Sequence, residues 1–63
     1  MNEKYPILRF FEFSHLPSKL QAVSEPFHTL AHTMANTLKE GPEVSAGLRH
    51  LLEAKDCAVR AAL

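Results

Sequence analysis

The chain has little that could brace a small fold covalently. Its 63 residues include one cysteine, Cys57, so an intrachain disulfide is excluded and a reducing, cytoplasmic compartment is expected. No cysteine–histidine cluster has the spacing of a structural zinc site, so neither a metal nor a cofactor is expected. Since domains of this size usually depend on disulfides, metal or oligomerisation, self-association is the expectation that remains.

An excess of charge of one sign is also missing, as are long hydrophobic runs. Seven basic and seven acidic residues cancel to a net charge of zero. A protein that coats a nucleic acid or an anionic membrane usually carries a basic excess, so DNA, RNA and membrane are not expected partners. No apolar run approaches the ~18 residues of a transmembrane helix. The apolar fraction of 46% is nevertheless that of a folded protein, and we expect a single small domain over 1–63.

Three segments can be distinguished along the chain. Residues 7–13 are rich in aromatic and branched side chains between prolines, which predicts a short strand or extended arm. Apolar residues then recur every three or four positions over 18–39, which predicts a helix. Its apolar stripe comprises Leu20, Val23, Phe27, Leu30, Met34 and Leu38.

Local signals refine the first predicted helix. Ser18 and Gln21 have the spacing of a capping box, which favours a start at Ser18. Ser24 could cap a second start before Pro26, so we expect a kink near 24–26. Gly41 at a left-handed position and the following Pro42 would end the helix.

A second helix is predicted over 43–62, and the short connection makes the two helices antiparallel. Its apolar face comprises Val44, Leu48, Leu51, Leu52, Ala58, Val59 and Ala62. The predicted fold class is therefore mainly α: an antiparallel helical hairpin with a short N-terminal extended arm or strand. Because the summed apolar face is wider than one hairpin covers, the hairpin is expected to self-associate.

Few residues suggest catalysis, and an enzyme is not expected. His28 and His32 are one helical turn apart, as in metal sites, but no third ligand is nearby in sequence, so a solvated polar face is the favoured interpretation. Cys57, in an alanine-rich stretch, is interpreted as a small buried hydrophobe. The row Thr29, Thr33, Thr37 either bonds back to helix carbonyls or lines a site between subunits, with the former favoured.

Two cations occupy unusual positions. Lys55 interrupts the apolar face of the second helix, so it either extends past the helix end or lies over a polar pocket at an interface. Arg9 lies within the aromatic arm. Aromatic rings stack on bases while arginine and lysine bind phosphates, so ligand binding and simple packing are both open at this point. Arg49, Glu53, Asp56 and Arg60 have the spacing of a ladder of surface ion pairs.

At these residues the chain resembles a known family. The arm from Arg9 to Pro17, with Phe13 and His15, and the closing helix with Leu51-Leu52-Glu53-Ala54 and Arg60 are similar to the phage anti-CBASS and anti-Thoeris nucleotide sponges, which share a helical-hairpin domain. The resemblance covers about residues 9–60.

The resemblance implies a homo-oligomer, a hexamer in that family, in the cytoplasm of an infected bacterium. It would bind cyclic dinucleotides, cyclic trinucleotides or cyclic ADP-ribose isomers between subunits without cleaving them. The ligand contacts it implies are Phe13, His15, Lys55, Asp56 and Arg60, and Arg9 is added from its own surroundings. The alternative function is a non-catalytic structural or protein-binding hairpin.

Overall fold

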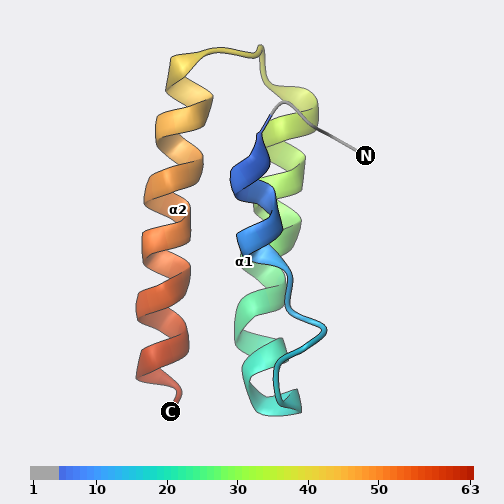
Figure 1. Ribbon diagram of the computed structural model, residues 1–63, viewed down its shortest axis with the longest axis vertical. Coiled ribbons are helices and arrows are strands. Elements are labelled where there is room, and N and C mark those ends of the chain that lie inside the picture. Colours follow the sequence, from blue (N-terminus) through green and yellow to red (C-terminus); the bar gives the residue numbers. More distant parts are fainter. Residues whose placement is uncertain (1–4) are drawn as a thin grey trace.

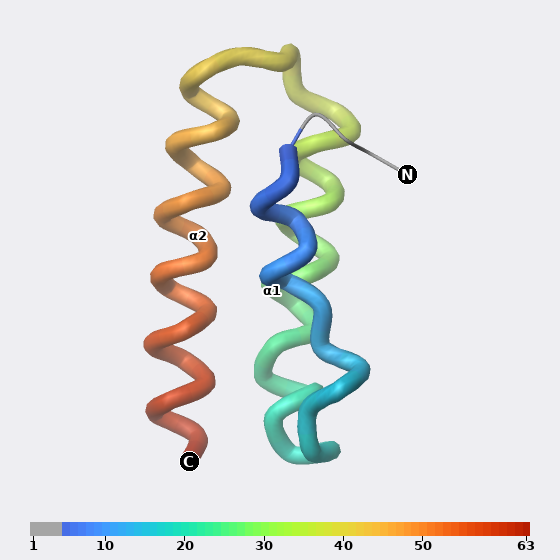
Figure 2. Tube along the Cα trace, viewed as in Figure 1, coloured from blue at the N-terminus to red at the C-terminus, as the bar shows by residue number. Residues whose placement is uncertain are grey.

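The computed structural model describes residues 5–63 and forms a helical hairpin (Figure 1). A 3-10 helix, η1 (Pro6–Phe11), precedes two long helices, α1 (Ser18–Thr37) and α2 (Pro42–Ala61). The helices α1 and α2 run antiparallel, as expected, and η1 contacts both of them. The traced chain passes down η1, turns through the linker 12–17, rises along α1 and returns along α2 (Figure 2).

The segment expected to be a strand or extended arm is instead the 3-10 helix η1. The buried side chains of Leu8 and Phe11 in η1, and of Tyr5 at its N-cap, are spaced by three residues. A 3-10 helix has three residues per turn, so this spacing places all three on one face. Backbone hydrogen bonding also favours the 3-10 helix over a strand. A lone strand leaves its amides unpaired, whereas the Leu8 amide here donates to the Tyr5 carbonyl at 3.0 Å.

The start of α1 differs from the predicted capping box. Pro17 occupies the N-cap position, and Ser18 is the first helical residue. The Gln21 side-chain amide turns back and donates to the carbonyl oxygens of Leu16, at 2.7 Å, and Ser14, at 3.3 Å. Gln21 therefore fixes the linker against the helix start. The helix continues through Pro26 to Thr37 as one element, so the second start expected after Ser24 is not formed.

The turn between the helices also differs in detail from the prediction. Leu38 is the C-cap of α1 in an extended conformation, so α1 ends two residues before the predicted boundary at 39. Gly41 is extended rather than left-handed, with φ 166° and ψ 179°, and serves as the N-cap of α2. Pro42 then occupies the first turn of α2, where its missing N–H costs little. Gly41 and Pro42 therefore predicted the position of the turn correctly. Their role is to begin α2, whereas they were expected to end α1.

The core lies where η1 meets the two helices. Helix α1 contributes the small residues Ala31 and Ala35, and α2 contributes Val44 and Leu48. Small side chains on α1 leave room for Phe11, which is completely buried. The predicted stripe of α1 is therefore only partly internal, because Leu30 and Leu38 remain 48% and 52% exposed.

Candidate functional site

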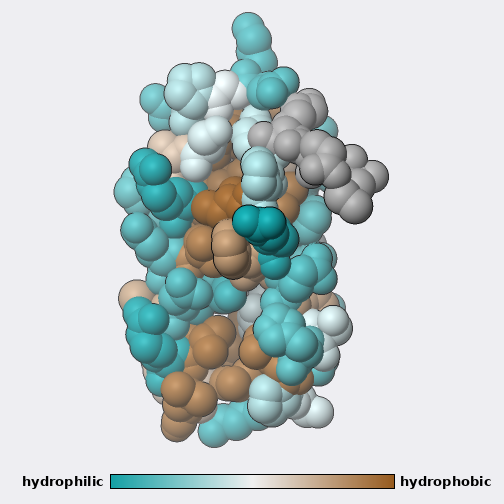
Figure 3. Space-filling view, in the orientation of Figure 1, coloured by the Kyte–Doolittle hydropathy of each residue, from teal (hydrophilic) through white to brown (hydrophobic). Residues whose placement is uncertain are grey.

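An open pocket of about 370 Å³ lies between the N-terminal segment and the C-terminal half of α2. This volume falls in the ordinary range for small-molecule sites. One wall is formed by η1 and the linker: Arg9, Phe10, Glu12, His15 and Leu16. The other wall is a single face of α2: Lys55, Asp56, Val59 and Arg60. The space-filling view shows hydrophobic atoms between the two helices and over the C-terminal end of α2, bordered by hydrophilic atoms (Figure 3).

The structure brings five of the six proposed ligand contacts to this pocket: Arg9, His15, Lys55, Asp56 and Arg60. The sixth, Phe13, lies elsewhere. Its ring packs edge-on against His28, with centroids 5.1 Å apart and an interplanar angle of 71°. Phe13 therefore helps to hold His28 in place and does not line the pocket.

Lys55 combines a buried stem with a polar head. Its side chain is only 13% exposed, and Nζ lies 3.5 Å from the Asp56 carboxylate. The hydrocarbon stem thus continues the apolar face of α2 while the ammonium group reaches the pocket. Of the two interpretations left open for Lys55, the structure favours a polar pocket over extension past the helix end.

The opposite wall carries a guanidinium group above an aromatic ring. The Arg9 guanidinium carbon is 5.2 Å from the centroid of Phe10, a cation–π distance. Phe10 is itself 54% exposed, which is unusual for a phenylalanine in a molecule with so small a core. The pocket therefore has three permanent cations, two carboxylates and an exposed aromatic ring on its walls.

The rest of the C-terminal helix corrects two expectations. Cys57 is exposed rather than buried, and its sulfur accepts a hydrogen bond from Arg60 Nη2 at 3.4 Å. The predicted ladder of ion pairs is not formed as such. Glu53 pairs with His50 at 3.4 Å and Asp56 pairs with Lys55, and within residues 5–63 neither acid is paired with an arginine.

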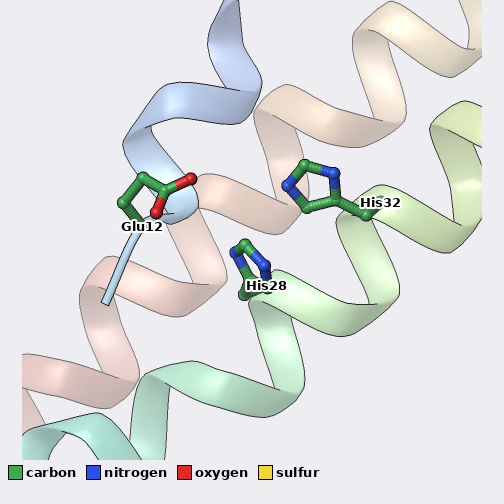
Figure 4. A group of neighbouring side chains, drawn as sticks. All are labelled: Glu12, His28 and His32. Atoms are coloured by element: carbon green, nitrogen blue, oxygen red, sulfur yellow. The ribbon is translucent and has the colours of Figure 1, made fainter. Parts of the chain in front are cut away.

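The histidine pair on α1 is not a solvated face, contrary to expectation. His28 and His32 are both half-buried, with ring centroids 4.4 Å apart. Glu12, directly after η1, completes a group whose potential ligand atoms all lie within 4.8 Å of one another (Figure 4). The spacing of the histidines was visible in the sequence. Glu12 had no sequence signal, because its approach depends on how the linker turns.

The threonine row follows the favoured interpretation at one position. The Thr37 hydroxyl donates to the Thr33 carbonyl at 2.6 Å, one turn earlier. All three threonines are exposed, so in this chain they lie at the surface and not at a close contact between helices.

In comparisons with known proteins, no family model, no curated protein and no solved structure matches this chain. Among residues 5–63, no helix combines the length and the apolar character that a membrane span requires.

Proposed function

We propose that this chain binds a small phosphate-bearing nucleotide in the pocket between the linker and α2, and sequesters it without chemical change. The observation that carries the proposal is the convergence of Arg9, Lys55 and Arg60 beside the exposed ring of Phe10. Arg9 and Phe10 come from η1 and Lys55 and Arg60 from α2, so the two pairs are far apart in sequence and meet only in the folded chain.

The pocket chemistry suits a nucleotide. Guanidinium and ammonium groups bind phosphate oxygens through charge-assisted hydrogen bonds, and arginine can do so with two parallel bonds. An exposed phenylalanine offers a face on which a base can stack. The Asp56 carboxylate, 48% exposed, can accept hydrogen bonds from base amino groups or sugar hydroxyls.

The more specific proposal follows from the family resemblance. The chain would act as a phage sponge that holds cyclic dinucleotides, cyclic trinucleotides or cyclic ADP-ribose isomers and lowers the free messenger in an infected bacterium. Sequestration requires tight binding in stoichiometric amounts and no activated nucleophile. A two-fold symmetric ligand would match two copies of the pocket related by the same symmetry.

Self-association is part of the proposal. Leu30 on α1 and Leu38, the extended residue that ends this helix, are 48% and 52% exposed, and these two side chains are called the exposed strip. A zero net charge imposes no long-range repulsion between copies. Covering this strip with another copy would add buried apolar surface to a small core, and a hexamer is the assembly that the resemblance favours.

Calorimetric titration tests the binding function. The parent protein and the variants Lys55→Ala and Arg60→Ala are titrated with a panel of cyclic dinucleotides, cyclic trinucleotides and cyclic ADP-ribose isomers. Each variant should weaken binding by about 10- to 100-fold, the loss expected for one hydrogen bond to a charged group. Arg49→Ala is the matched control, since Arg49 is exposed on the same helix outside the pocket.

Two further measurements complete the test. Circular dichroism should show the same helical signal for all variants, and mass spectrometry should recover the ligand intact. Absence of heat with every ligand, or equal losses for Arg49→Ala and Lys55→Ala, would contradict the proposal.

The exposed strip supports a second candidate, a hairpin that docks on another protein. Exposed leucines such as Leu30 are the kind of anchor that a hydrophobic groove accepts from a helix. Retention of one stoichiometric protein partner, with binding lost in Leu30→Glu and unchanged in Lys55→Ala, would favour this function over the nucleotide sponge.

A further inference from the structure

We propose that Glu12, His28 and His32 form a binding site for one zinc-class transition-metal ion. The site would join the linker after η1 to the middle of α1. It uses residues that the nucleotide proposal does not require, apart from Glu12, which also lines the pocket.

The first argument is the donor set. Two imidazoles and one carboxylate form a known three-residue ligand set for zinc, with the fourth tetrahedral position left to water. Such nitrogen-rich sites favour zinc and its neighbours over calcium and magnesium, which prefer oxygen ligands.

The second argument is the orientation of His28. Its Nδ1 lies 3.2 Å from the carbonyl oxygen of Phe11, and a carbonyl can only accept. Nδ1 therefore carries the proton, which leaves the lone pair on Nε2 for a metal. This is the outer-shell arrangement that usually accompanies a metal-bound histidine, and the edge contact from Phe13 further restricts the ring.

The third argument is an unpaired atom. Nε2 of His32 is shielded from solvent and has no hydrogen-bond partner among residues 5–63. A buried polar atom without a partner is unfavourable and rare in folded proteins. A metal ion between His28 and His32 would give this atom a partner, because the lone pair of a neutral imidazole nitrogen can coordinate a metal.

Only a small movement of the side chains is needed to bring the three ligand atoms to the distances of a zinc site. The ligand atoms lie within 4.8 Å of one another, whereas a tetrahedral zinc ion with ligands at about 2.1 Å needs about 3.4 Å between them. Glu12 is exposed and free to change its side-chain rotamer. Its carboxylate points toward the two imidazoles, which lie one turn apart on α1 (Figure 4).

Competition with a chromophoric zinc chelator tests the proposal in the full-length chain. All proteins carry Cys57→Ser, because an exposed thiol can bind zinc by itself. The parent should remove one zinc ion per chain from the chelator. His32→Gln and Glu12→Gln should each weaken zinc binding by at least about tenfold, since even the loss of an outer-shell partner of a metal site costs about 10- to 100-fold. His50→Gln, which removes an exposed histidine on α2, is the matched control and should bind as the parent does.

A second readout separates the site from a folding defect. Zinc should raise the unfolding temperature of the parent and of His50→Gln, and should leave that of Glu12→Gln and His32→Gln nearly unchanged. Glu12→Gln alters only an exposed side chain, so its fold is expected to survive even if His32→Gln does not fold. The proposal is overturned if the parent fails to compete for zinc, or if Glu12→Gln binds zinc as tightly as His50→Gln.

Discussion

The imidazole of His28 is bound to the main chain of Phe11, whose carbonyl oxygen lies 3.2 Å from Nδ1. The two residues are 17 positions apart, and their contact fastens η1 to the middle of α1. The Phe11 side chain is fully buried at the same point. This junction unites the N-terminal segment with the hairpin and so positions one wall of the pocket.

Phe11→Ala should therefore be severely destabilising. Removing a buried phenylalanine costs about 3–5 kcal/mol, while a domain of this length has only about 3–9 kcal/mol of stability in total. Circular dichroism with urea should show a large loss of folded protein. Phe10→Ala, which truncates an exposed ring next to it, should change the unfolding free energy by less than about 0.5 kcal/mol. Similar midpoints for the two variants would contradict the assigned core.

Ser24→Ala should stabilise the chain. The Ser24 hydroxyl is completely buried in α1 and has no hydrogen-bond partner in the part of the chain that the structure describes. Alanine removes that unsatisfied group and is the better helix former, so a gain of about 1 kcal/mol is expected. Thermal unfolding would measure it. Ser45→Ala, at an exposed position in α2, should raise the stability less, because only the difference in helix propensity contributes. An equal rise for both variants would contradict the contribution from the buried hydroxyl of Ser24.

Gly47→Ala should be stabilising by up to about 1 kcal/mol, the difference in helix propensity between the two residues. A Cβ at Gly47 would lie 3.2 Å from the terminal methyl of Met34, a tight contact with the end of a flexible side chain. Met34 can turn away with little strain. Chemical denaturation of Gly47→Ala alone and combined with Met34→Ala would isolate the contact. If Gly47→Ala lowers the stability and the added Met34→Ala restores it, Met34 cannot move away from the new methyl group, and the prediction is wrong.

Leu30→Glu combined with Leu38→Lys should weaken self-association without unfolding the hairpin. Both leucines are about half exposed, and the core does not depend on them. Sedimentation velocity at several concentrations should show the parent as an assembly and the double variant shifted toward monomer. A parent that remains monomeric at micromolar concentration would contradict the proposed assembly. Lys19→Glu, an exposed change elsewhere on α1, serves as the control for altered charge.

Much of the fold could be predicted from the sequence because helical periodicity is a local property. The three- and four-residue spacing of apolar side chains located both helices, and the Gly41–Pro42 turn separated them within one or two residues. The prediction of a strand or extended arm over 7–13 was wrong because it relied on composition, and branched and aromatic residues favour strands. The decisive feature of this segment was the three-residue spacing of Tyr5, Leu8 and Phe11, which is helical and does not fit the two-residue alternation of a strand.

The sites depend more on contacts between distant segments. The unusual position of Lys55 on the apolar face could be recognised from the sequence alone, but its opposition to Arg9 and Phe10 depends on where η1 packs. Burial was hardest to predict for residues of intermediate polarity. Cys57 proved exposed on α2, and His28 and His32 proved half-buried, because the linker and η1 pack against this part of α1.

Glu12 is the one side chain shared by the pocket and the histidine group. In the absence of a bound cation the negative charge of Glu12 repels phosphate. A divalent ion bound to this carboxylate would replace that repulsion with attraction. Thermodynamic reciprocity then requires that an anionic ligand and the ion each strengthen the binding of the other by an equal factor. Parallel titrations with and without zinc would measure that factor, and the Glu12→Gln protein should show a value close to one.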